Sequence, residues 1–490
     1  MSRVAAIAVA DARSRFRRTS TVVVFLLLSA LAYFWVPDPG TGRALMQIAG
    51  RRAIYNSAAI AMATALLGAL FVGLAGFYVV SNAVRRDAQS RVGAIIAVTP
   101  LRSGEYIAGK FLGNALFLAT FFGGFMLVSM AMVVVRGEAP LEPWTFVKQY
   151  LLLAPPPIVF VSALAILFEC VPWLSGRFGD VVYFFLFTAS MGLATAAVVS
   201  GTMPWAAYFD PSGLAAALAQ NTAMMHTTSF SIGSSPFDVH KPPIIYPGLP
   251  VDARFVAQRL TSMLMPLPLL LLARVSFHRF DPARIRVAAK AERRWLGRLN
   301  ALLKPLTRGL LRMPAARSLP LAAVADAQLT VALLPAIAIA IVAVAIARNL
   351  PFAFLAMAMA IADVAARDVG ANTIGILYSA PRLREHFVAW KAMSTAIVAL
   401  AFVITFPSPA TFVGAFVVVA LATCLANAKA FIVLFLSFWY IVVNDHGATP
   451  ALDFAGFYGK ATPSILLAYV LLGAALLAAA TLTHAARAGR

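Results

Sequence analysis

Charged residues are scarce in this chain of 490 residues, and acidic ones are the scarcest. Only 12% of the residues are charged, with 19 Asp and Glu against 40 Lys and Arg. A soluble domain needs roughly 25% charged residues to cover its surface. Because this chain has half of that and is 61% hydrophobic, its composition excludes a water-soluble globular protein and indicates one that lies in lipid.

Cysteine is almost absent, and no arrangement of residues suggests chemistry on this chain. The two cysteines, Cys170 and Cys424, both lie in apolar segments, which excludes a disulfide framework. No nucleophile is paired with a base, so we expect no catalytic residues. The grouping of His226 with Asp238 and His240 is ordinary for an interfacial segment, and we expect no metal site.

Long apolar runs recur along the chain. A transmembrane helix needs about 20 mainly apolar residues. This rule predicts an all-α, polytopic membrane protein with about 12 transmembrane helices, and an even number places both termini on the same side. The predicted spans are 20–37, 56–82, 111–135, 150–171, 181–203, 259–277, 328–347, 351–366, 391–407, 411–427, 429–443 and 463–485.

The basic residues orient these spans. With both termini inside, the inner segments carry 30 of the 40 Lys and Arg and the outer segments carry 10, as the positive-inside rule requires. We therefore interpret the net charge of +21 as a sign of membrane topology and contact with anionic lipids, and we expect no nucleic-acid partner. Arginines among apolar residues in 1–19 predict a cytoplasmic amphipathic helix, although a cleaved signal peptide stays an alternative.

The chain contains an internal repeat, in which the window 86–110 aligns without a gap on the window 367–391. Arg86, Asp87, Ile95, Pro100, Ala108 and Lys110 are matched by Arg367, Asp368, Ile376, Pro381, Ala389 and Lys391. Both windows lie between the second and third spans of their half. The repeat predicts two parallel six-helix halves, and the domains follow from it. They are an N-terminal helix (1–19), a first half (20–277) with an external insertion (204–258), a basic linker (278–327) and a second half (328–490).

Each repeated window predicts a short cytoplasmic helix that ends before a proline, because proline blocks helix continuation. The basic residue that follows, Lys110 or Lys391, can hold the inner interface by snorkelling. Gly109 and Gly113, at the start of the third span, suit close helix packing.

The retention of these two loops in a diverged repeat indicates a constraint on them. Lipid-facing residues can be exchanged among apolar types, whereas a loop that fits a partner cannot. Two such loops suit a partner that is itself a dimer. The alternative is that they are only tight interfacial loops.

The first window resembles the first cytoplasmic loop of permeases of the ABC-2 type exporter family. The resemblance rests on Gly93–Arg102 and on the entry Tyr106–Gly113, and more weakly on 367–391. It implies that each loop carries a coupling helix that docks on an ATPase subunit, in the cytoplasmic membrane of a bacterium. The coupling residues that it implies are Arg86, Asp87, Pro100, Lys110, Arg367, Asp368, Pro381 and Lys391.

The ATPase itself is expected on separate subunits, which would bind the ATP and magnesium. Gly104–Phe111 matches a P-loop except at its last position, where Phe111 cannot hold Mg²⁺. Two departures from the family stand out. Most members are half-size, and the second half offers only 444–462 where an external insertion is expected.

Two other function classes stay open, a 12-span secondary transporter or lipid flippase without an ATPase, and a membrane scaffold. An ion-driven carrier normally keeps ionisable residues within its spans. Here the acidic residues inside the spans are Glu169 and Asp363, both near predicted cytoplasmic ends. They are either interfacial residues or part of the substrate pathway.

Overall fold

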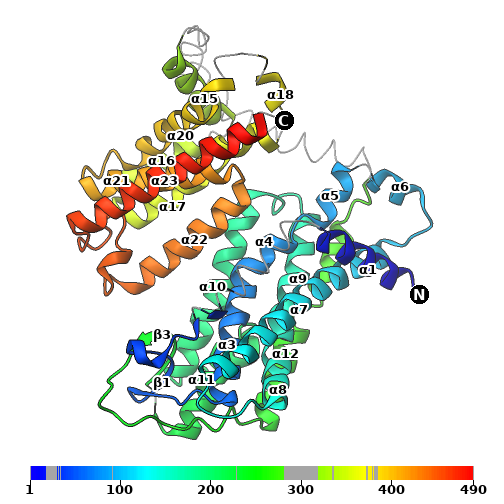
Figure 1. Ribbon diagram of the computed structural model, residues 1–490. Coiled ribbons are helices and arrows are strands. Elements are labelled where there is room, and N and C mark those ends of the chain that lie inside the picture. Colours follow the sequence, from blue (N-terminus) through cyan, green and yellow to red (C-terminus); the bar gives the residue numbers. More distant parts are fainter. Residues whose placement is uncertain are drawn as a thin grey trace. The chain divides into compact units, whose positions relative to one another are not determined.

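The computed structural model describes the chain except for residues 1, 18–29, 31, 34, 91, 228, 281–317, 334–335, 371–372, 378, 380–383 and 489–490. The chain forms two compact units, Met1–Pro282 and Ala283–Arg490, and each is described by itself. Helices dominate both units (Figure 1).

Unit 1 consists mainly of helices. Its helices are α1 (Arg3–Phe16), α3 (Ser57–Phe71), α4 (Phe77–Val80), α5 (Ala83–Gln89), α6 (Val92–Val98), α7 (Ser103–Arg136), α8 (Pro143–Leu153), α9 (Pro155–Cys170), α10 (Arg177–Val199), α11 (Leu214–Met225), α12 (Ala253–Leu264) and α13 (Leu269–Ser276). The prolines that begin α9 break the predicted fourth span into α8 and α9, as the sequence indicated.

Helices α3 and α4 are joined by a π-helical turn, η2 (Val72–Gly76). Gly73 is required there because the ring of Phe187 fills the space that a Cβ atom would occupy. The hydroxyl of Tyr183 donates a hydrogen bond of 2.5 Å to the Gly73 carbonyl, which satisfies a backbone group that the irregular turn releases. The two helices therefore form one continuous apolar segment with a local distortion.

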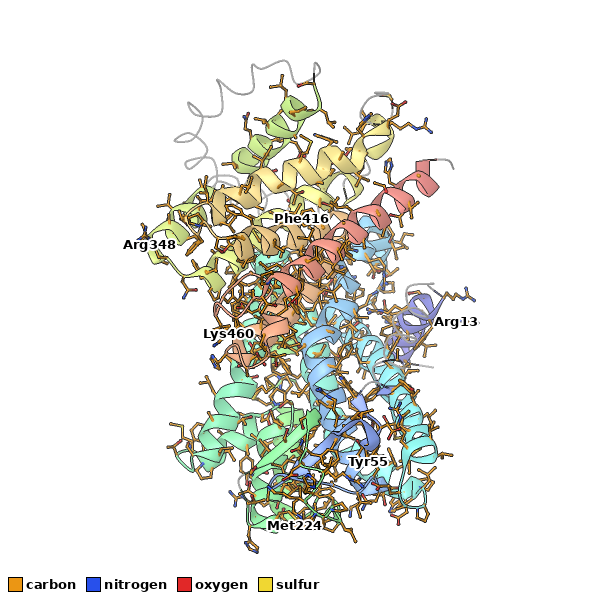
Figure 2. The ribbon with its side chains drawn as sticks, turned by 60° about the vertical axis from the view of Figure 1, so that its left-hand side comes forward. Arg13, Tyr55, Met224, Arg348, Phe416 and Lys460 are labelled. Carbon is orange, nitrogen blue, oxygen red and sulfur yellow. The ribbon has the colours of Figure 1, made fainter. Side chains whose placement is uncertain are left out.

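A small antiparallel sheet closes one end of unit 1. Its strands are β1 (Arg43–Ile48), β2 (Arg51–Arg52) and β3 (Phe230–Pro236), in the order β2-β1-β3. Strand β3 has a Ser- and Gly-rich composition that is typical of a loop, but it pairs with β1, which lies far away in the sequence. Tyr55 lies at this end of the unit, whereas Arg13 lies on α1 at the other end (Figure 2).

The segment 204–258 also contains helical segments. They are η3 (Pro204–Phe209) and α11.

Arg52 and Glu138 form a two-pronged ion pair at 2.6 and 2.7 Å beside the sheet, and the backbone N–H of Tyr55 donates to the same carboxylate. The turn between α7 and α8 is thereby tied to the sheet.

Unit 2 is also helical. Its described helices are α15 (Leu319–Leu333), α16 (Ala336–Ala347), α17 (Leu350–Gly370), α18 (Ile374–Leu377), α20 (Phe387–Val403), α21 (Pro409–Leu425), α22 (Ala428–Asp445) and α23 (Pro463–Ala488). Helix α15 begins within the predicted linker and continues into the predicted seventh span, and α16 covers the rest of that span.

The described residues include eight helices that are long and apolar enough to cross a membrane, and four shorter apolar helices. The chain is therefore a helical, multi-pass membrane protein. The first predicted span, 20–37, lies largely outside the described residues. The predicted spans 391–407 and 411–427 coincide with two of the shorter helices, Phe387–Val403 and Pro409–Leu425.

Candidate functional site

A buried cluster of charges surrounds Asp11 in unit 1. The Asp11 carboxylate accepts from Arg86 at 2.5 Å, from Lys110 at 2.9 Å and from Arg15 at 2.9 Å. Lys110 also pairs with Asp87 at 2.8 Å. These residues come from α1, α5 and α7, so the cluster ties α1 to two elements that lie far from it in the sequence.

Hydrogen bonds between charged and neutral groups complete this first cluster. The hydroxyl of Tyr106 donates to Asp87 at 2.8 Å. The guanidinium of Arg15 donates to the side chain of Asn114 at 2.6 Å and to the carbonyl of Val80 at 3.3 Å. Buried charges are tolerated only when they are paired and hydrogen-bonded in this way.

Two glycines allow α1 to approach α7 closely enough for these contacts. A Cβ atom on Gly109 would lie 2.7 Å from Ile7, and one on Gly113 would lie 3.1 Å from the Asp11 side chain. This spacing of small residues, four apart on one helix face, is the arrangement that brings helix backbones together. The prediction that both glycines serve close helix packing is confirmed.

The repeated window 86–110 of unit 1 contains the short helix α6, as expected. Residues that follow α13 contact this loop and hold it in place. The ring of Phe280 lies against Gly93, and Arg279 donates to the carbonyl of Thr99 at 2.7 Å. Phe277 stacks on Tyr106 with ring centres 5.1 Å apart. Ile95, by contrast, is 64% exposed.

Unit 2 contains a second buried cluster of the same kind, centred on Asp326 of α15. The Asp326 carboxylate pairs with Lys391 at 2.9 Å and with Arg367, and Lys391 also pairs with Asp368. Arg367 donates a further hydrogen bond of 3.2 Å to the hydroxyl of Thr330. The cluster ties α15, α17 and α20.

The loop beside the second cluster repeats the features of the first. It contains the short helix α18, and its Ile376, the repeat partner of Ile95, is 73% exposed. Phe387 stacks on His484 with ring centres 5.1 Å apart, as Tyr106 stacks on Phe277. In both units an aromatic residue four positions before the buried lysine therefore packs against the last helix or its end.

The structure brings together six of the eight residues that we expected to couple to an ATPase. Arg86, Asp87 and Lys110 meet in the first cluster, and their repeat partners meet in the second. Pro100 is exposed in the loop and its carbonyl accepts from Arg3 at 3.3 Å. Pro381 lies outside the described residues.

Snorkelling would require the two lysine side chains to extend outward to the membrane interface, but they do not. Lys110 and Lys391 are both buried, and each pairs with two carboxylates. Our expectation of snorkelling was therefore wrong. The physical reason is that a carboxylate from a distant helix reaches each ammonium group, so that the charge is neutralised within the protein.

Glu169 has a structural contact at the base of the first loop. Its carboxylate accepts from the backbone N–H groups of Ala83, Val84 and Arg85 at 2.9, 2.7 and 3.0 Å. It thus satisfies N–H groups in the first turn of α5 that have no partner within the helix. Asp363 is half-buried in α17. A role of either residue in substrate passage stays a prediction.

The central residues of both clusters, Asp11 and Asp326, were missed by the sequence reasoning. A signal for them exists, because Ala8–Ala12 and Ala323–Ala327 have the same sequence, Ala-Val-Ala-Asp-Ala. An alignment in the register that superposes the two loops cannot detect this match, because the two halves differ in length between this segment and the loop.

The stability that the first cluster contributes depends on pH through the pKa of Asp11. Burial raises this pKa, but the positive charges of Arg15, Lys110 and Arg86 outweigh burial and hold it below its ordinary value of 3.8. A lowered pKa contributes stability above the unfolded value and loses it as the pH falls through the folded value.

We therefore expect the thermal stability advantage of the wild-type chain over Asp11→Asn to stay constant from pH 7 down to about 4, and to shrink only below that. The measurement is the unfolding midpoint of both purified proteins across this range. An advantage that already disappears near neutral pH would contradict the charge assignment.

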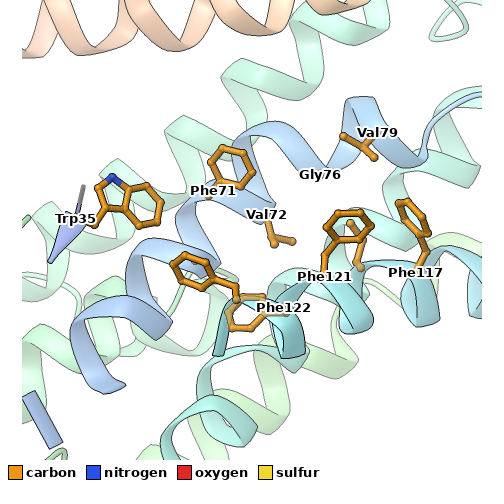
Figure 3. Close-up of a pocket in the computed structure, with 11 residues that line it drawn as sticks. Trp35, Phe71, Val72, Gly76, Val79, Phe117, Phe121 and Phe122 are labelled. Atoms are coloured by element: carbon orange, nitrogen blue, oxygen red, sulfur yellow. The ribbon is translucent and has the colours of Figure 1, made fainter. Parts of the chain in front are cut away.

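An apolar pocket lies between α3–η2–α4 and α7 (Figure 3). Aromatic rings from Phe71, Phe117, Phe121 and Phe122 surround it, and Gly68 and Gly76 leave room within it. Charged side chains are not among the described residues that line it. Such a pocket accommodates an apolar group rather than an ion.

In comparisons with known proteins, no family model matches the chain, and no curated protein or solved structure shows significant similarity to it.

Proposed function

We propose that this chain is the membrane-spanning permease subunit of an ATP-binding-cassette exporter, with both transmembrane halves in one polypeptide. ATP hydrolysis is supplied by separate ATPase subunits that dock on the two repeated loops. The observation that supports this most is that each repeated window combines an exposed isoleucine on a short helix with a buried charge cluster that joins the window to α7 or α20.

This pairing suits a surface that must transmit force. Ile95 and Ile376 occupy equivalent positions of the repeat and are both exposed. A large apolar side chain at the centre of an interface can contribute much of its binding energy. The charge clusters connect each loop to α7 or α20, so that movement of the loop would be passed on to a membrane helix.

In this mechanism the coupling residues do no chemistry. Closure of two ATPase subunits would displace both loops, and the buried ion pairs would carry the displacement into the bundles. Asp87 and Lys110, with Asp368 and Lys391, are the residues that join the loop to the following helix. The two halves would then open a path for the substrate.

The substrate class follows from the few charges in the spans and from the apolar pocket on α7. The pocket is lined by aromatic and aliphatic side chains together with glycines. This favours an amphipathic or lipid-like cargo, or an apolar peptide, over a small ion. The membrane would be the cytoplasmic membrane of a bacterium, with both termini inside.

Purification of the full chain from its native membrane, followed by mass spectrometry, tests the proposal. We expect an ATP-binding protein to co-purify at about two copies per chain, and transport to stop when ATP is depleted. Transport that survives ATP depletion but collapses with an ionophore would instead favour a secondary carrier, and would overturn the proposal.

A further inference from the structure

We infer that helix α15 is a second copy of α1, and that Asp11 and Asp326 are equivalent positioning residues that fasten these helices to the two loops. Docking of the two loops on an ATPase rests on the proposed function, whereas the equivalence of the two helices is independent of it. It assigns the end of the predicted linker to the second half, as that half's own starting helix.

The first support is that the same pentapeptide makes the same contacts in both units. Asp11 and Asp326 lie at the fourth position of Ala-Val-Ala-Asp-Ala. Each accepts from the arginine that begins the repeated window and from the lysine that ends it. Two halves of the chain therefore place one aspartate on the same two cations.

The packing around each aspartate supports the same equivalence. Helix α1 lies against α7, and α15 lies against α20, which is the repeat partner of α7. Ala8 and Ala323, three residues before the aspartate, are both buried. In unit 1 a Cβ atom on Gly113 of α7 would lie 3.2 Å from the Ala8 carbonyl, whereas in unit 2 Trp390 of α20 packs with Ala323.

The spacing explains why the equivalence is hidden in the sequence. Asp11 precedes its arginine by 75 residues, whereas Asp326 precedes Arg367 by 41. The longer interval belongs to the first half, where it contains strands β1 and β2. A comparison in one fixed register therefore aligns the loops but not the starting helices.

The two clusters differ in the number of cations that pair with the central aspartate. Four residues after the aspartate, the first helix carries Arg15 and the second carries Thr330. Among the residues that the structure describes, Asp11 therefore pairs with three cations and Asp326 with two. Removing the charge of Asp11 leaves more unbalanced positive charge, so α1 should be released more completely than α15.

Cysteine labelling of the full-length protein in lipid nanodiscs tests this inference. Cys170 and Cys424 are first replaced by alanine, and a reporter cysteine is placed at the buried position Ala8 or Ala323. We expect Asp11→Asn to raise the maleimide labelling rate at position 8 at least tenfold and to leave position 323 unchanged. Asp326→Asn should do the reverse, with a smaller increase.

Three controls separate positioning from general damage. Asp238→Asn neutralises an exposed aspartate and should change neither rate. Asp11→Glu and Asp326→Glu retain the charge and should restore slow labelling. Where Asp11→Asn is not monodisperse, Arg86→Gln replaces it, because it removes one partner and leaves Asp11 paired with Lys110 and Arg15.

Unchanged labelling in either aspartate variant, or equal release of both helices by one substitution, would overturn the inference. The labelling needs no ATPase, so its result is independent of the proposed function. With an ATPase that co-purifies, a second readout is the number of substrate molecules transported per ATP. We expect this ratio to fall in both aspartate variants and to recover in the glutamate variants.

Discussion

Replacement of Ile95 and Ile376 together by glutamate is expected to abolish binding of the ATPase, with a loss of affinity of about 1,000-fold. Both side chains are exposed, at 64% and 73%, so the change does not disturb packing within either unit. An apolar residue at the centre of an interface contributes about 2 kcal/mol or more, and about 1.4 kcal/mol corresponds to tenfold in affinity. Two such losses give about three orders of magnitude, and each buried glutamate charge adds to them.

The measurement is titration of the purified ATPase against the chain in nanodiscs. Ile245→Glu is the matched control, because Ile245 has the same side chain and is 67% exposed in a segment beside the sheet, outside both repeated windows. It should bind the ATPase like the wild-type chain. Each single variant should lose about 30-fold in affinity. Tight binding by the double variant would remove both loops from the docking surface.

Lys391→Met is expected to destabilise unit 2 by about 3–5 kcal/mol, the usual cost of removing one partner from a buried ion pair. Lys391 is only 1% exposed and lies between the carboxylates of Asp326 and Asp368. Without the ammonium group, two buried carboxylates face each other with Arg367 as the remaining cation. The measurement is the free energy of unfolding in a denaturant series, with insertion into the membrane verified separately.

A double substitution distinguishes loss of charge balance from loss of packing. Asp368→Asn with Lys391→Met removes one charge of each sign, so its loss of stability should be smaller than the sum of the two single losses by about 0.5–3 kcal/mol, the usual coupling energy of contacting groups. A double variant as unstable as the sum of the two singles would show that the two side chains act independently. Lys460→Met, in the segment before α23, is the control for loss of an exposed lysine and should change stability by less than about 0.5 kcal/mol.

The membrane helices could be predicted because the signal for them is local. Runs such as those of α7 and α21 are apolar over most of their length, and a bilayer accepts such runs wherever they occur in the chain. The short helices α6 and α18 were predicted for a similar reason, because each ends before a proline. The sheet was missed, because β3 contains serine and glycine and pairs with a strand far away in the sequence.

The candidate site was predicted only in part, and the missing part is the acidic centre of each cluster. The repeat identified the arginine, aspartate and lysine of each window, because these lie close together in the sequence, in 86–110 and again in 367–391. Asp11 lies 99 residues from Lys110 and Asp326 lies 65 residues from Lys391. Contacts over such distances depend on how helices pack, and in the register of the loops the matching pentapeptides do not align.

By itself, the sequence determined that the chain lies in a membrane, that its spans are helical and that one short window between spans occurs twice. Composition and periodicity suffice for these conclusions, since lipid demands apolar helices with internally bonded backbones. Only the tertiary structure decided what the charged residues of that window do. It paired the lysines with carboxylates from α1 and α15, because a charge buried between helices is stable only where another helix supplies its partner.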